Sequence, residues 1–240
     1  TGVVEIGPGV GCLTEQLALR AAKVIAFEVD ERLKPVLART LAPYDNIEVV
    51  FGDVMARDLG EEVRSCFPGL RPILCANLPY NITTPVLTKI YESRCFETIT
   101  VMVQKEVALR LCASPGEKDY GAFTLLTQWY AEPELLFDVG PECFVPRPKV
   151  TSAVVRIAMR KTPPVDADEK ALFRVIRAAF NQRRKTLVNA LTAGLGLDKA
   201  AAERAVQNCG LDPRARGEAV DLGGFAKITD EIRRLKLADL

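Results

Sequence analysis

The 240-residue chain contains no histidine, and this absence excludes several classes of enzyme. Ser-His-Asp and Cys-His catalysis both need an imidazole, and so do metal sites built on histidine. The seven cysteines are scattered, odd in number and form no CxxC pair. That pattern argues against a disulfide framework or a zinc site and favours a reducing compartment. We therefore expect a cytoplasmic protein that holds no metal.

The chain also lacks long apolar runs. No stretch approaches the roughly 18 consecutive apolar residues of a membrane span, and no signal peptide opens the chain, so we expect no membrane partner. Hydrophobic residues make up 48% and charged residues 26%, which is ordinary globular usage. The length suits one large core or a core plus a small satellite domain, and a monomer is the default expectation.

The net charge of +1 hides an uneven distribution along the chain. Residues 1–150 carry 15 Lys and Arg against 20 Asp and Glu, whereas residues 151–240 carry 17 against 11. Segregation of this kind favours contact between the C-terminal part and a polyanion. A well-solvated helical domain would show the same balance.

The first half alternates short apolar runs with helical patterns, which predicts right-handed βαβ units in a mainly parallel, doubly wound α/β sheet. The expected strands are residues 3–6, 24–29, 47–50, 73–76 and 98–103. Helices are expected to about residue 22 after the first strand, then over residues 31–41 and 84–93.

Two late strands, 135–139 and 153–158, have no full helix between them and predict an antiparallel hairpin at the sheet edge. The proline-rich stretch 162–166 then reads as a linker. Helical spacing of apolar residues from Leu172 to Phe180, followed by three further helical patterns, predicts an all-α domain. The predicted domains are residues 1–161 and 162–240.

A glycine turn containing Gly7 and Gly9 follows the first strand and opens the first helix. Glycines there let the backbone approach a ligand closely, although an ordinary tight connection would look the same. Cys12 occupies the third glycine position of a dinucleotide fingerprint, which weighs against a nicotinamide enzyme. Glu28 ends the second strand, where a carboxylate can accept hydrogen bonds from both ribose hydroxyls of a nucleoside cofactor.

Two further strands end in polar residues. Asp53 follows the third strand, where it could accept a hydrogen bond from an adenine amino group or simply shape a turn. The fourth strand ends in Asn77-Leu78-Pro79-Tyr80, the most specific motif of the chain, although an ordinary turn could have the same sequence. The Asn side-chain oxygen and a backbone carbonyl held by the proline can accept both hydrogens of an exocyclic base amine, while the tyrosine ring stacks on the base. This chemistry directs a weakly nucleophilic nitrogen at a methyl sulfonium without a general base.

Phe144 lies in a proline-rich loop with two basic neighbours, Arg147 and Lys149, which we expect to contact RNA phosphates. Its ring could sandwich a flipped base against Tyr80, or could pack beneath the loop.

Three consecutive cations follow the first helical pattern of the C-terminal domain. No acidic residue occurs between Lys170 and Asp198, whereas a solvated helix face usually intersperses acids. We therefore predict phosphate contacts by Arg183, Arg184 and Lys185.

Taken in order, the motifs EIGPGVG, FEVD, GD, NLPYN, FVPRPKVTSAVV and AFNQRRKTLVNAL resemble the KsgA-type ribosomal RNA adenine N6,N6-dimethyltransferases over nearly the whole chain. The resemblance implies a class I methyltransferase fold with a C-terminal helical RNA-binding domain, and S-adenosylmethionine as methyl donor. It implies two successive transfers to each of two adjacent adenines near the 3′ end of 16S rRNA in the small subunit. The positions matching the family's functional residues are Gly7, Gly9, Glu28, Asp53 and Asn77 for the cofactor, Asn77, Leu78, Pro79 and Tyr80 for catalysis, and Phe144 for base stacking.

The family's GQNFL-like N-terminal motif has no counterpart here, and the chain starts almost at its first strand with Thr1, so it is expected to be N-terminally truncated. This departure favours a second hypothesis, an RNA-binding ribosome-assembly factor with little methyl transfer. A DNA adenine methyltransferase is a third, because NLPY would suit it equally well.

Overall fold

The computed structural model describes residues 1–182, 184–235 and 237–238, which divide into two compact units. Unit 1 comprises residues 1–108 and 131–160, and unit 2 comprises residues 109–130 and 161–240. Residues 109–130, predicted to lie in the first domain, fall in the same unit as the C-terminal helices. The domain boundaries 1–161 and 162–240 stay a prediction. No helix among the described residues is long and apolar enough to cross a membrane.

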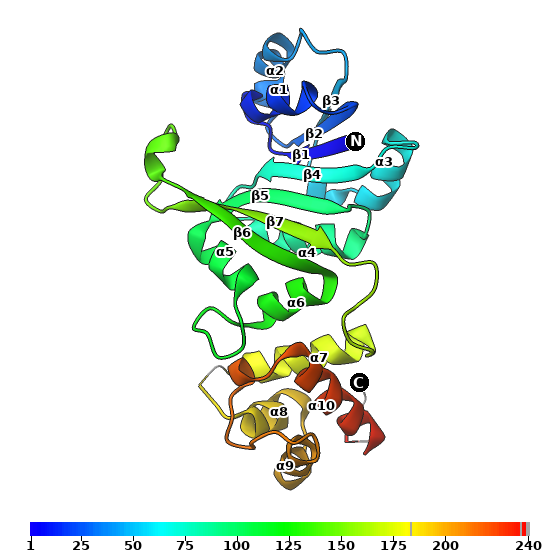
Figure 1. The fold of residues 1–240 in the computed structure, drawn as a ribbon, viewed down its shortest axis with the longest axis vertical. Coiled ribbons are helices and arrows are strands. Elements are labelled where there is room, and N and C mark those ends of the chain that lie inside the picture. The colour runs from blue at the N-terminus through cyan, green and yellow to red at the C-terminus, as the bar shows by residue number, and fades with distance from the viewer. Residues whose placement is uncertain (183, 236, 239–240) are drawn as a thin grey trace. The chain divides into compact units, whose positions relative to one another are not determined.

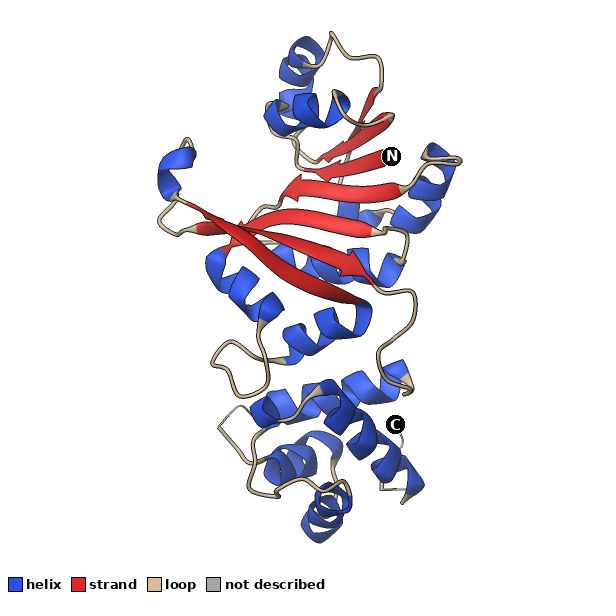
Figure 2. Ribbon diagram, in the orientation of Figure 1, coloured by secondary structure: helices blue, strands red, loops and turns tan. Residues whose placement is uncertain are grey.

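Unit 1 is built on one seven-stranded sheet in the order β3-β2-β1-β4-β5-β7-β6 (Figures 1 and 2). The first five strands are parallel, and β6 and β7 are antiparallel, which confirms the predicted α/β class. The strands are β1 (Gly2–Ile6), β2 (Lys23–Glu28), β3 (Ile47–Phe51), β4 (Pro72–Asn77), β5 (Thr98–Gln104), β6 (Ala131–Val139) and β7 (Ser152–Met159).

The connections between the parallel strands are short helices. They are α1 (Cys12–Ala18), η1 (Glu31–Leu33), α2 (Lys34–Thr40), η2 (Val54–Ala56), α3 (Leu59–Cys66) and α4 (Thr83–Ser93). Every residue of β1 is buried, as expected for a central parallel strand covered on both faces. From β1 the chain builds outward through β2 and β3, and then returns through β4 and β5. The sheet therefore reverses its winding between β1 and β4, the point at which open α/β sheets generally bind their ligands, beyond the carboxyl ends of the strands.

The late hairpin extends the sheet, with β7 between β5 and β6 and β6 outermost. Pro133 in β6 and a register shift between Leu135 and Phe137 fit an edge strand, where a missing N–H and a bulge are tolerated. A loop containing η3 (Pro141–Cys143) joins the two strands at the carboxyl edge of the parallel sheet.

Unit 2 is helical. Its helices are α6 (Ala122–Tyr130), α7 (Glu169–Phe180), α8 (Leu187–Leu195), α9 (Lys199–Asn208), η4 (Gly217–Ala219) and α10 (Leu222–Arg234), while α5 (Lys105–Cys112) begins in unit 1. Leu172, Val175 and Ile176 of α7 are fully buried, as their helical spacing predicts. Asp168 caps α7 by accepting a hydrogen bond from the Ala171 N–H at 2.9 Å.

Segment 109–130 is tied to the C-terminal part of unit 2 by specific bonds. The Gly116 N–H donates to the Glu218 carbonyl at 2.7 Å, and the Tyr120 hydroxyl donates to the Val220 carbonyl at 2.9 Å. The Tyr120 ring also meets Phe180 edge-on, with centroids 6.3 Å apart. These bonds join residues about a hundred positions apart in sequence, since the Tyr120–Val220 separation is 100.

Candidate active site

The glycine turn after β1 adopts a backbone that only glycine takes up easily. Gly7 has φ of 73° and Gly9 has φ of 59°, both in the left-handed region. The Gly7 N–H donates to the Phe27 carbonyl at 2.9 Å, which fixes the turn to the end of β2. The space where a Gly9 Cβ would lie is open, with nothing within 4 Å. The turn can therefore accept a ligand close to its backbone.

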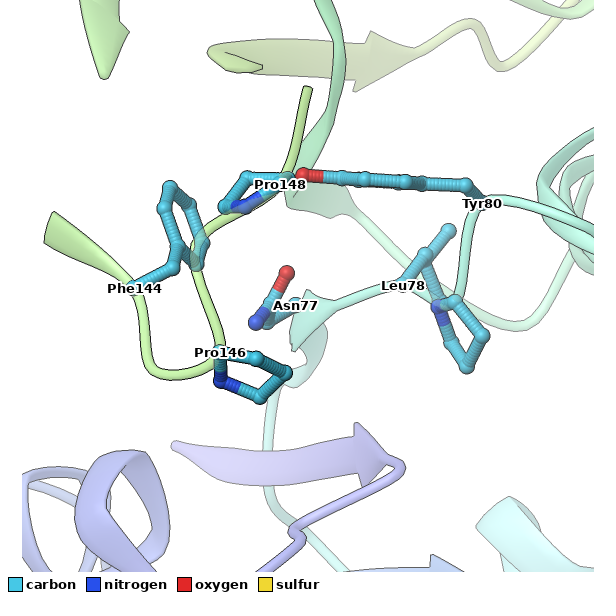
Figure 3. A pocket seen from close by; sticks show the side chains of 7 residues that line it. Asn77, Leu78, Tyr80, Phe144, Pro146 and Pro148 are labelled. Atoms are coloured by element: carbon cyan, nitrogen blue, oxygen red, sulfur yellow. The ribbon is translucent and has the colours of Figure 1, made fainter. Parts of the chain in front are cut away.

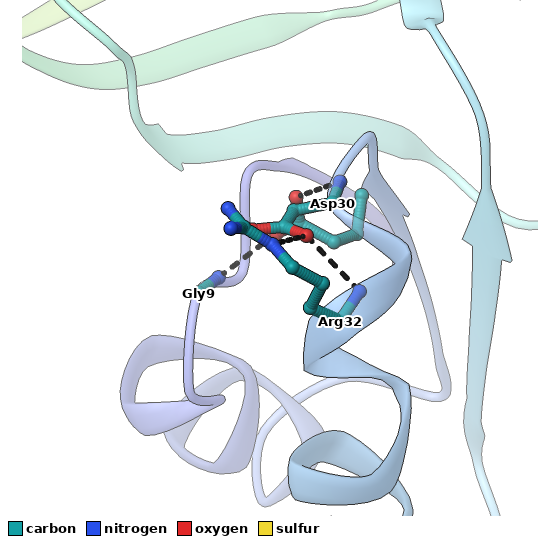
Figure 4. A network of polar contacts seen from close by, with 4 residues as sticks. Gly9, Asp30 and Arg32 are labelled. Atoms are coloured by element: carbon teal, nitrogen blue, oxygen red, sulfur yellow. Dashed lines mark hydrogen bonds and ion pairs between the residues drawn. The ribbon is translucent and has the colours of Figure 1, made fainter.

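Glu28 faces this turn from the end of β2. Its side chain is only 5% exposed, and its Oε2 accepts a hydrogen bond from the Gly9 N–H at 3.3 Å (Figure 4). Its Oε1 accepts from the Asp30 N–H at 2.8 Å. The carboxylate is thus held in one orientation beside the glycine turn.

Asp30 itself pairs with Arg32, whose Nη2 lies 2.8 Å from Asp30 Oδ2 (Figure 4). This hydrogen bonding to Arg32 lowers the pKa of the Asp30 carboxyl below its ordinary value. Asp30 therefore stays ionised, and the Arg32 guanidinium offsets its charge at this edge.

Asp53 is exposed just beyond β3, and its Oδ1 accepts a hydrogen bond from the Met55 N–H at 2.8 Å, which caps η2. The preceding Gly52 N–H donates to the Glu28 carbonyl at 2.8 Å. Asp53 is therefore a turn residue, and the same contact keeps it at the carboxyl edge next to Glu28. This geometry is compatible with both roles that the sequence leaves open for Asp53, a turn residue and an acceptor for an adenine amino group.

The Asn77–Tyr80 motif lies where β4 turns into α4. The Asn77 side chain is exposed, whereas Leu78 is only 1% exposed and anchors the turn in the core. The Pro79 carbonyl accepts hydrogen bonds from Thr83 Oγ1 at 3.0 Å and from the Ile82 N–H at 3.2 Å. Because Pro79 is committed to starting α4, the Leu78 carbonyl is the backbone acceptor left next to the Asn77 amide.

A pocket of about 300 Å³ opens at this motif. It is lined by Asn77, Leu78, Pro79, Tyr80, Phe144, Pro146 and Pro148. Figure 3 shows the Asn77 amide in the middle of the group, with the Tyr80 and Phe144 rings on different sides of it. The structure thus brings Phe144 to the motif although 64 positions separate it from Tyr80 in the sequence.

The lining of this pocket offers few kinds of chemical group. It consists of two aromatic rings, three prolines, one aliphatic side chain and one amide, with no carboxylate, thiol or ammonium among the described lining residues. Such a pocket can stack a flat heterocycle and accept hydrogen bonds from its amine. It cannot supply a general base of matched pKa.

Some predicted site residues lie outside this pocket. Arg147 and Lys149 belong to the same loop as Phe144 but are exposed, and Arg147 Nη2 lies 3.8 Å from Glu142 Oε2. Arg184 and Lys185 are exposed in unit 2, between α7 and α8. Arg183 lies outside the described residues. Phosphate contact by these five cations stays a prediction.

Two polar residues of unit 1 escaped the sequence reasoning. Glu5, inside β1, is 1% exposed, and burial raises the pKa of its carboxyl to about 7, although the nearby Thr14 hydroxyl opposes the rise. Its Oε2 has no hydrogen-bond partner among the described residues. A charged residue within an apolar strand is the signal that could have found it. The other residue, Ser152, is fully buried at the start of β7, and no local pattern marks it.

Comparison with known proteins gives a consistent assignment. The family described as "Ribosomal RNA adenine dimethylase" matches residues 1–232. The "Ribosomal RNA small subunit methyltransferase A" of Geobacillus thermodenitrificans is 47% identical over 98% of this chain and 82% of its own length. The protein of the same name from Bacillus cytotoxicus is 46% identical over 96% of this chain and 81% of its own length.

Solved structures agree on the fold. A dimethyladenosine transferase from Plasmodium falciparum aligns with a TM-score of 0.78 and 24% identity, covering 100% of this chain and 92% of that one. The 23S rRNA methyltransferase ErmE aligns with a TM-score of 0.71 and 26% identity, covering 97% and 91%. The predicted class I methyltransferase fold with a C-terminal helical domain is confirmed. On these matches, the chain belongs to the ribosomal RNA adenine dimethylase family.

Proposed function

We propose that this protein transfers methyl groups from S-adenosylmethionine to the N6 amines of two adjacent adenines near the 3′ end of 16S rRNA, during assembly of the small ribosomal subunit. One observation carries the proposal. An amide acceptor, Asn77, lies between two aromatic rings in a pocket at the carboxyl end of β4. That pocket adjoins the point where the winding of the sheet reverses, next to the glycine turn and Glu28.

The residues at the reversal point fit the nucleoside part of the cofactor. The Glu28 carboxylate is preoriented to accept both ribose hydroxyls, Gly7 and Gly9 permit close approach, and Asp53 with Asn77 extends the polar edge on either side. Glu5 adds a buried carboxyl oxygen without a hydrogen-bond partner among the described residues, close behind the turn. When bound, S-adenosylmethionine supplies an electrophilic methyl group.

The pocket at Asn77–Tyr80, called the base pocket from here on, would hold the adenine. Asn77 Oδ1 and the Leu78 carbonyl accept the two hydrogens of the N6 amine, which fixes the direction of the nitrogen lone pair. The rings of Tyr80 and Phe144 stack on the two faces of the base. The amine proton lost in each transfer passes to water, because the described residues that line the pocket include no basic side chain. Further, we propose that the protein acts as a monomer in the cytoplasm.

A transfer assay tests the proposal. We expect tritiated methyl from S-adenosylmethionine to enter small subunits that lack the two dimethyladenines, with little or none entering duplex DNA. Mass spectrometry of digested rRNA should find N6,N6-dimethyladenosine at two adjacent positions. Incorporation into DNA instead would support a DNA methyltransferase. RNA binding without incorporation would support an assembly factor.

The basic residues of unit 2 give a separate prediction on RNA binding. We expect the double substitution Arg184→Ala/Lys185→Ala to weaken rRNA binding and to reduce the slope of log K against log salt by about 1.4 to 1.8, if each cation neutralises one phosphate. Binding titrations over a range of salt concentrations measure this slope.

The matched control removes two cations of unit 1, Lys23 and Arg71, which lie at the amino ends of the parallel strands β2 and β4. Lys23 pairs with Glu48 at 3.0 Å, and Arg71 pairs with Glu97 at 2.7 Å. The substitution Lys23→Ala/Arg71→Ala changes the net charge equally and should leave the salt slope unchanged. Equal slopes for the two double variants would mean that net charge, not local phosphate contact, governs binding.

A further inference from the structure

A hydrogen bond joins the catalytic motif to the start of β7. The Tyr80 hydroxyl and Ser152 Oγ lie 2.6 Å apart, across 72 positions of sequence. Ser152 is fully buried and is the first residue of β7, where it pairs with Gln104 of β5 on one side and Val139 of β6 on the other. Since both neighbouring strands hold it, Ser152 is a rigid anchor for a tyrosine side chain that is itself half-buried.

This bond also links the two walls of the base pocket. The loop that carries Phe144 ends at Ser152, and its residues Phe144, Pro146 and Pro148 form one wall. Tyr80, on the turn between β4 and α4, belongs to the other wall. The Tyr80–Ser152 hydrogen bond therefore fixes the Tyr80 ring relative to β7, the strand that directly follows the Phe144 loop.

We propose that Ser152 is a positioning residue that holds the Tyr80 ring in stacking geometry, and that the second methyl transfer to each adenine depends on it more than the first. The inference rests on the proposed function and deepens it, because it concerns how the same pocket handles two successive substrates.

The difference between the two transfers follows from the count of amine hydrogens. In the first transfer the N6–C bond forms as the bond from sulfur to the methyl carbon breaks, and one N6 proton leaves to water. The unmodified amine offers two hydrogens to Asn77 Oδ1 and the Leu78 carbonyl, whereas the monomethylated amine offers one. One acceptor then has no partner, so the orientation of the base relies more on stacking between the rings.

The test compares Ser152→Ala, Tyr80→Phe and the double variant with the unchanged protein. We expect each single substitution to slow the second transfer about two- to tenfold, the range of one hydrogen bond, and Ser152→Ala to change the first transfer by less than twofold. Monomethyladenosine should then accumulate, as measured by mass spectrometry of rRNA over the time course. The double variant should show no further loss, because both single changes remove the same bond.

A second readout needs no methyl donor. An rRNA fragment with 2-aminopurine at the target position carries its amine on C2, not C6, so its fluorescence reports stacking without the Asn77 contact. We expect weaker quenching on binding to Ser152→Ala and Tyr80→Phe than to the unchanged protein. Ser93→Ala is the matched control, because Ser93 Oγ donates to the Ile90 carbonyl at 2.7 Å and does not line the base pocket.

The outcomes separate the inference from the function on which it rests. Unchanged product ratios and quenching in both single variants would overturn the inference alone, and so would additive losses in the double variant. If the unchanged protein produced no dimethyladenosine, the proposed function would fail first. Tyr80→Phe alters a half-buried ring tip and tests the same bond should Ser152→Ala fail to fold.

Discussion

Substitution of Asn77 by Ala should reduce methyl transfer about 10²- to 10³-fold, the usual cost of removing one group that stabilises charge in a transition state. The Asn77 amide oxygen is the only side-chain acceptor among the described residues that line the base pocket, apart from the Tyr80 hydroxyl. Without it the amine keeps one acceptor and loses its fixed direction. The stability of the protein should change little, because the Asn77 side chain is exposed at the strand end. Single-turnover transfer assays and urea unfolding measure the two effects separately.

Asn46 offers a control in which stability, and not turnover, should fall. Its Nδ2 donates to the Ala18 carbonyl at 2.9 Å and to the Ala21 carbonyl at 3.0 Å, which satisfies acceptors left over at the end of α1. Asn46→Ala should lower the free energy of unfolding by about 1–3 kcal/mol while leaving turnover of the folded protein intact. Turnover that survives in Asn77→Ala, or falls equally in both variants, would contradict the assigned role.

The second large effect concerns Glu28. We expect Glu28→Gln to weaken binding of S-adenosylmethionine, or of its demethylated product, about ten- to 100-fold, as for loss of hydrogen bonds to a charged acceptor. The structure explains why an amide is a poor replacement. Both carboxylate oxygens accept backbone N–H groups, from Gly9 and from Asp30. Either orientation of a glutamine would set its NH₂ group against one of these donors. Isothermal titration calorimetry gives the affinity directly.

Glu31 provides the matched control for charge. It is exposed at the first position of η1, three residues beyond Glu28, so Glu31→Gln removes the same charge from the same edge. Cofactor affinity should stay within about twofold of the unchanged protein, as for an exposed charge screened by water and salt. An equal loss in both variants would show that the edge acts through its net charge, and Glu28 would lose its special role.

The fold could be predicted from the sequence where a local pattern determines it. The alternation of apolar runs and helical spacing predicted all seven strands of unit 1 and the helices of the C-terminal part, because each of these elements carries its own local hydrophobic pattern. The first helix ends at Ala18, not near residue 22, because the Ala22 N–H donates to the Thr1 carbonyl and the chain has already turned toward β2. Helices α3, α5 and α6 were not predicted.

The residues of the candidate site also differ in whether a local sequence pattern can predict them. Gly7, Glu28, Asp53 and Asn77 each end or follow a parallel strand, so the topology alone brings them to one edge. Phe144 could be predicted as a partner of Tyr80 only as one of two alternatives, and the structure brings the two residues to one pocket. Ser152 could not be predicted, because its bond to Tyr80 depends on the antiparallel insertion of β7 beside β5.

The interleaving of the two units limits how the protein can be recombined. Segment 109–130 lies between two stretches of unit 1 in sequence but bonds with residues near 218–220 and with Phe180 of unit 2. A chimera joined at the linker 162–166 would therefore pair one parent's Tyr120 segment with the other parent's η4 and α7. An exchange of unit 2 between relatives must carry residues 109–130 together with the C-terminal helices, so three junctions, near residues 108, 130 and 160, define the exchanged module.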